Sequence, residues 1–110
     1  AYHFVMGIMA LKAGKVSVAE SAFRKCEQMK YAHYRLASQY YLGRIYADRG
    51  DKVKARKKFE QVLQKADPEL EAPLIKACEE AYLDNEGPLP LKLKPRSLAL
   101  FMPEADMISY

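Results

Sequence analysis

The chain has few of the features that mark an enzyme, a metal site or a membrane protein. Its 110 residues include no tryptophan, two cysteines and two histidines. No stretch approaches the roughly 20 consecutive apolar residues that a membrane-spanning helix needs. Nucleophile-elbow, P-loop, dinucleotide-binding and metalloprotease motifs are all missing. These absences argue against an enzyme, against a bound cofactor or metal, and against a membrane span.

The scarce cysteines and histidines lie apart from one another. Cys26 and Cys78 form no CxxC pair, and each has apolar neighbours at helical spacing, which predicts two buried free thiols. His3 and His33 have no carboxylate or cysteine at metal-ligand spacing, so we expect neither to bind a metal or act as a base. Reduced thiols suit a cytoplasmic protein. The chain opens at an alanine inside an apolar helix, without a basic leader, and we therefore expect a fragment of a longer protein.

Composition indicates one folded domain with a weak basic bias. Half of the residues are hydrophobic, enough for a modest core in a chain of this length. The formal net charge of +4 permits nucleic-acid binding but does not by itself indicate it.

Hydrophobic periodicity predicts an all-α fold with five helices, over residues 1–13, 16–29, 31–48, 52–66 and about 70–84. Gly14 ends the first helix as a left-handed C-terminal residue. Ser17, with Glu20 three residues later, predicts the N-cap of the second helix, and Asp51 predicts the N-cap of the fourth. Together these helices make a domain over residues 1–87.

Residues 88–110 form a proline-containing C-terminal tail, for which we expect extended backbone. The apolar residues between Ser97 and Met102 need cover. These residues could pack on the apolar stripe of the 70–84 helix, or they could insert into an aromatic groove on the same molecule or on a neighbouring one. The first helix is apolar nearly all round, so it meets either a preceding repeat or a partner. Self-association through the N-terminal helix or the tail is one outcome of these two features.

The chain repeats itself after 36 residues. This shift pairs two residues of the same kind at four positions and a cysteine with a valine at a fifth: Gly7 with Gly43, Gly14 with Gly50, Ala19 with Ala55, Phe23 with Phe59, and Cys26 with Val62. Small residues on both helices of such a hairpin let the two backbones approach closely, while the aromatic side chains fill the space beside them.

The repeated pattern resembles the tetratricopeptide repeat, a helix-turn-helix unit with the signature W-x2-L-G-x2-Y, then A-x3-F, then Pro. The second unit, about 34–68, matches at Leu42, Gly43, Tyr46, Ala55, Phe59 and Pro68. The first unit, about 1–30, matches at Gly7, Ala19 and Phe23. Gln39 stands where tryptophan is usual, and the period exceeds the usual 34 residues. The helix at 70–84 is then the first helix of a third unit or a capping helix.

The resemblance implies a short right-handed α-solenoid of stacked hairpins. Such arrays hold a peptide or a helix of a partner protein in a concave groove lined by the first helix of each unit. The corresponding positions of this chain are Phe4, Ile8, Leu11, Lys12, Tyr40, Tyr41, Arg44 and Asp48. Because apolar side chains stand at the first two of them, the resemblance favours an apolar or aromatic ligand over a C-terminal carboxylate.

A nucleic-acid-associated helical repeat is the alternative. Its candidate surface is a basic face of the fourth helix, made of Lys52, Lys54, Arg56, Lys57 and Lys58. Such a run is either a solvated helix face or a stripe that contacts phosphates. We expect a protein-interaction scaffold, with an adaptor or assembly role, rather than nucleic-acid binding.

Overall fold

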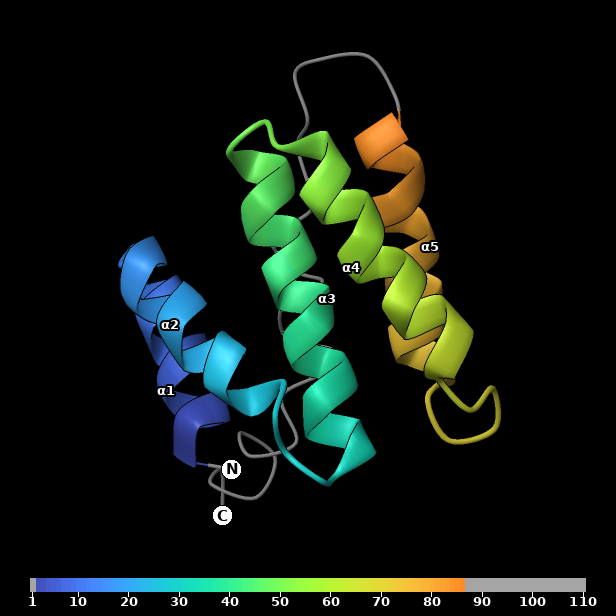
Figure 1. Cartoon of the computed structure of the whole chain (residues 1–110), viewed down its shortest axis with the longest axis horizontal. Coiled ribbons are helices and arrows are strands. Elements are labelled where there is room, and N and C mark those ends of the chain that lie inside the picture. Colours follow the sequence, from blue (N-terminus) through green and yellow to red (C-terminus); the bar gives the residue numbers. More distant parts are fainter. Residues whose placement is uncertain (1, 87–110) are drawn as a thin grey trace.

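The computed structural model describes residues 2–86 and shows, within that range, α-helices and no strand (Figure 1). The helices are α1 (Tyr2–Lys12), α2 (Val16–Cys26), α3 (Ala32–Asp48), α4 (Lys52–Lys65) and α5 (Ala72–Glu86). The predicted all-α class is therefore confirmed. All five predicted helices are present, and their ends differ from the prediction by no more than three residues. The predicted tail, 88–110, lies outside the described residues.

The same tight turn joins α1 to α2 and α3 to α4. Gly14 and Gly50 adopt left-handed backbone conformations, with φ of +78° and +85°. In the first turn the Lys15 N–H donates to the Ala10 carbonyl at 2.8 Å, and the equivalent bond 36 residues later is 2.9 Å long. These bonds belong to the Schellman motif, which satisfies the free carbonyls at a helix end. The predicted role of Gly14 is confirmed, and the two hairpins share one turn geometry.

The hairpin turn also decides where the second helix of each pair begins. In α4 the Asp51 side chain accepts a hydrogen bond from the Lys54 N–H at 3.2 Å, which confirms the predicted N-cap. The prediction of Ser17 as the cap of α2 is wrong, because α2 begins at Val16 and its N-cap is Lys15. The turn fixes this position, which is equivalent to Asp51, and lysine has no acceptor to offer there. α2 therefore starts without a side-chain cap.

Each hairpin is closed by a glycine that faces a phenylalanine ring. A Cβ atom placed on Gly7 would lie 2.7 Å from the Phe23 ring, and one on Gly43 would lie 2.5 Å from the Phe59 ring. No real side chain fits at such distances, so only glycine allows these two helix pairs to approach as they do. The predicted packing residues with complete or near-complete burial are Gly7, Ala19, Phe23, Leu42, Gly43, Ala55 and Phe59. Tyr46 is half-buried and Pro68 is exposed between α4 and α5.

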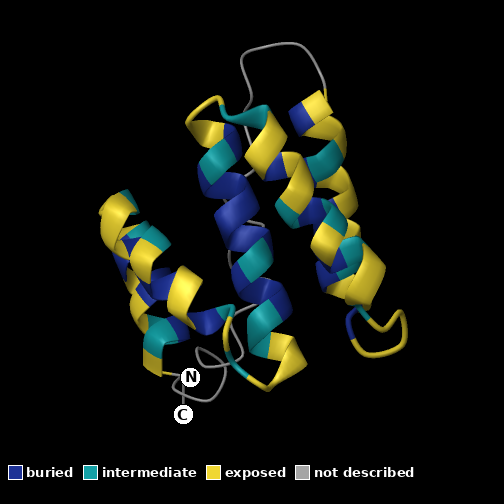
Figure 2. Ribbon diagram, viewed as in Figure 1, coloured by how far each residue is buried: buried dark blue, intermediate teal, exposed yellow. Residues whose placement is uncertain are grey.

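The hairpins and α5 lie side by side and share one core (Figures 1 and 2). α2 packs on α3, and α5 packs on α4 and on α3. Leu74, Cys78 and Ala81 form the buried stripe of α5, as its amphipathic pattern predicts. The Asn85 amide donates to the Lys52 carbonyl at 3.0 Å and fastens the end of α5 to the start of α4.

Candidate partner-binding surface

The eight predicted groove residues come from α1 and α3 and differ in exposure. Lys12 and Asp48 are exposed, and Leu11 is half-buried. The others are buried: Phe4, Ile8, Tyr40, Tyr41 and Arg44. The side chains that a partner can reach directly are thus the polar ones at the C-terminal ends of α1 and α3.

Two of the buried groove residues pack between hairpins. The Phe4 ring lies 6.0 Å from the Phe23 ring of α2, in an edge-to-face arrangement. Tyr41 stacks on the same Phe23 ring, with 5.2 Å between centroids and 14° between planes. Such aromatic pairs add stability beyond the area that they bury. Phe4 and Tyr41 therefore hold α1, α2 and α3 together, and a partner contact at these two residues stays a prediction.

The aromatic cluster continues into the second hairpin. Tyr40 lies 5.2 Å from Tyr41 and 6.3 Å from Phe59, measured between ring centroids. The Arg44 guanidinium lies 5.7 Å from the centre of the Tyr40 ring, within the range of a cation–π interaction. One connected set of aromatic rings thus joins the two hairpins behind the predicted groove positions. These contacts stabilise the packing of α1 and α3 on the rest of the core.

Burial changes the titration of two groove residues. Removal from water raises the pKa of the Tyr41 hydroxyl, so this side chain stays neutral throughout the ordinary pH range. Asp48 is exposed as a residue, but partial desolvation of its carboxyl raises its pKa, while the nearby Arg44 guanidinium acts in the opposite direction. Asp48 therefore takes up a proton at a higher pH than an ordinary aspartate.

The basic face of α4 is partly neutralised within the fold. Lys58 forms an ion pair with Glu27, and both side chains are mostly shielded from solvent. Arg56 forms a forked ion pair with Glu86, with bonds of 2.5 and 3.0 Å. Lys57 is exposed. Lys54 Nζ lies 3.9 Å from the Asp51 carboxylate. Since ion pairs occupy three members of the predicted stripe, the face offers phosphates less positive charge than the sequence suggests.

Residues far apart in the chain form further polar contacts that the sequence did not reveal. His33 Nδ1 lies 2.7 Å from Glu71 Oε1, although 38 residues separate them. The sequence spacing around His33 shows no carboxylate partner, but the fold brings the start of α3 beside the residue that precedes α5. Arg49 pairs with Glu20 at 2.5 Å in the same way, joining α2 to the end of α3. No local spacing signals either pair.

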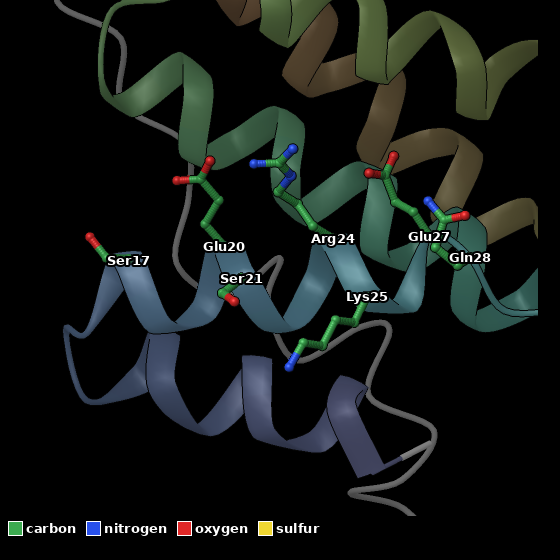
Figure 3. A pocket seen from close by; sticks show the side chains of 7 residues that line it. All are labelled: Ser17, Glu20, Ser21, Arg24, Lys25, Glu27 and Gln28. Carbon is green, nitrogen blue, oxygen red and sulfur yellow. The ribbon is translucent and has the colours of Figure 1, made fainter.

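A hollow of about 620 Å³ lies on the outer side of α2 (Figure 3). It is lined by Ser17, Glu20, Ser21, Arg24, Lys25, Glu27 and Gln28. Arg24 points away from α1 and Lys25 points toward it (Figure 3). Glu20 and Glu27 are already engaged in the ion pairs described above. Within residues 2–86 no group of three His, Cys, Asp or Glu side chains is placed to hold a metal ion, and the lining of this hollow combines acidic, basic and neutral polar side chains.

Both cysteines should resist alkylation in the native protein. Burial raises the pKa of the Cys26 thiol, and it raises the pKa of the Cys78 thiol to about 12. The reactive thiolate is therefore scarce at pH 8, and neither sulfur is accessible. Mass spectrometry after iodoacetamide treatment at pH 8 should show no adduct, and two adducts in denaturant. Rapid labelling of either residue in the native protein would contradict the burial described here.

None of the helices within the described range has the length and apolar character needed to cross a membrane. Comparisons of this chain with protein-family models, with curated proteins and with solved structures gave no match. A proposal for its function therefore depends on the geometry of its own residues.

Proposed function

We propose that this chain is a short helical-repeat module of the tetratricopeptide type, a right-handed α-solenoid that binds a peptide or helix of a partner protein. The observation that carries the proposal is the glycine–phenylalanine contact, which occurs once in each hairpin. In both hairpins an alanine follows the glycine by 12 residues and the phenylalanine follows by 16. A shared turn, a shared small-residue position and a shared ring contact support one repeating unit.

The proposed groove runs along the first helices, α1 and α3. Lys12 and Asp48 occupy equivalent positions, 36 residues apart, and both are exposed at helix ends. Their opposite charges can orient a bound peptide, while the aromatic cluster behind them keeps the helices in place. The role proposed for the module is that of an adaptor or assembly factor. Two free buried thiols are in keeping with the cytoplasm as its location.

The groove can be tested by site-specific crosslinking. A photo-crosslinking amino acid replaces Lys12 or Asp48 in the full chain, which is then expressed in its source cells. We expect the same partner to be captured from both positions, because both border the proposed groove. Lys57, exposed on α4, is the matched control and should not capture that partner. Capture from Lys57 alone would place the binding surface on the second helices and contradict the proposal.

Nucleic-acid binding through α4 is the less favoured function. The ion pairs of Arg56 and Lys58 reduce the charge available to phosphates. Tight RNA or DNA binding that weakened steeply with salt would favour it instead.

A further inference from the structure

The 36-residue register continues into α5 and defines an interface that occurs twice. Four residues of α3 are buried: Ser38, Tyr41, Leu42 and Ile45. Their equivalents in α5 are also buried: Leu74, Ala77, Cys78 and Ala81. α2 packs on α3, and α4 packs on α5. In the second case the Cys78 thiol donates to the Phe59 carbonyl at 3.4 Å. In both cases the second helix of one hairpin packs on the helix that follows it, at this set of four positions.

The same set of positions in α1 has no helix over it within the described residues. The equivalents are Tyr2, Val5, Met6 and Met9. Tyr2, Met6 and Met9 are 72%, 38% and 65% exposed, and Val18 of α2 is exposed beside them. A hollow of about 300 Å³ between the two helices is lined by His3, Met6, Ser17, Val18, Ser21, Ala22 and Lys25. Tyr2, Met6, Met9 and Val18 are together called the N-terminal face. They belong to the α1–α2 hairpin, which lies at one edge of the described helices (Figure 1).

We propose that the N-terminal face is a docking site for an amphipathic helix of another protein, built like α2 and α4. The apolar stripe of those two helices has an alanine, a phenylalanine four residues later, and a cysteine or valine three residues after that. Continuity with the two internal interfaces assigns this occupant, because the same four positions receive such a helix in α3 and in α5. The lining of the hollow includes Lys25 and no carboxylate, so the partner helix carries an acidic residue opposite Lys25.

Within residues 2–86, no helix of this kind is free to bind the N-terminal face of a second copy of the chain. α2 already covers α3, and α4 already covers α5. The exposed side of α5 carries Lys76, Glu79 and Glu80. Glu79 is in register with Gly43, so α5 also lacks the glycine at which a further phenylalanine would pack. Within residues 2–86 no helix is therefore left to cover this face, and the proposed occupant belongs to a different protein. This site is independent of the proposed groove, since neither Lys12 nor Asp48 belongs to it.

A tethered helix tests the site in the full chain. A copy of residues 15–28, with Cys26→Val in the copy, is attached before Ala1 through about 15 Gly/Ser residues, which span about 20 Å on average. Tethering raises the effective concentration to the millimolar range. Methionine-methyl NMR is expected to show shifted Met6 and Met9 signals and an unmoved Met29 signal. The melting temperature is expected to rise by about 4 °C.

Matched variants separate docking at this face from other effects. Met6→Lys with Met9→Lys should abolish the rise in melting temperature, whereas Leu83→Lys, at an exposed apolar residue of α5, should leave it unchanged. Phe23→Asp in the tethered copy should also abolish it. Unmoved methyl signals, or an equal rise with the Phe23→Asp copy, would overturn the proposal. So would a dimer of the untethered protein that Met9→Lys dissociates, since the occupant would then be a second copy. The crosslinks from Lys12 and Asp48 test the groove separately.

Discussion

Replacing Gly43 by leucine is expected to destabilise the fold by about 3 kcal/mol or more, although leucine is the better helix former. Even a Cβ atom at this position would lie 2.5 Å from the Phe59 ring, so α3 and α4 would have to separate. Gly7→Leu should act in the same way through Phe23, where the corresponding distance is 2.7 Å. Denaturant unfolding of the full chain, followed by circular dichroism, measures both effects.

Two further variants identify the cause of that loss. Lys57→Glu, on the exposed side of α4, should change the free energy of unfolding by less than about 0.5 kcal/mol. Gly43→Ala combined with Phe59→Ala should cost clearly less than the sum of the two single changes, because shortening the ring relieves the clash. A Gly43→Leu protein as stable as the parent, or strict additivity in the double variant, would show that the glycine is not needed for close helix approach.

Truncating Tyr41 to alanine is expected to cost about 3–5 kcal/mol, the usual range for a buried aromatic residue. Its ring is fully buried, stacks on Phe23, and lies 6.2 Å from Phe4 and 5.2 Å from Tyr40. The loss would fall on the contact between the hairpins, so hydrogen exchange should accelerate in α1 and α2. Tyr31→Ala is the matched control, since Tyr31 is largely exposed and should be nearly neutral. Equal losses for the two variants would contradict the packing role of Tyr41.

Local rules were sufficient to predict the helices and the turn residues Gly14 and Asp51. The five helices follow from apolar residues at a spacing of three to four, which depends only on neighbours within a few turns. Gly14 and Asp51 were identified for the same reason, because left-handed backbone and N-capping are properties of single positions. The prediction of Ser17 as an N-cap was wrong because the geometry of the preceding turn places the N-cap of α2 at Lys15.

The candidate site was harder to predict because its properties depend on which helices become neighbours. Apolar residues of α1 and α3 could face either a groove or α2, and periodicity does not distinguish these surroundings. The structure turns Phe4 and Tyr41 toward Phe23 of α2. The contact of His33 with Glu71 likewise depends on the path of the chain over 38 residues, which no spacing rule covers.

Two ion pairs, one between α2 and the end of α3 and one between α4 and α5, also favour one order of the repeat units. Glu20 of α2 meets Arg49, whereas the equivalent residue of α4, Arg56, meets Glu86, so the charges are reversed at the second junction. If the second helices exchanged places, Glu20 would face Glu86 and Arg56 would face Arg49. Both pairings would place like charges together, which disfavours the wrong arrangement. A chain built from two similar hairpins thus distinguishes its first unit from its second by the sign of one charge on each.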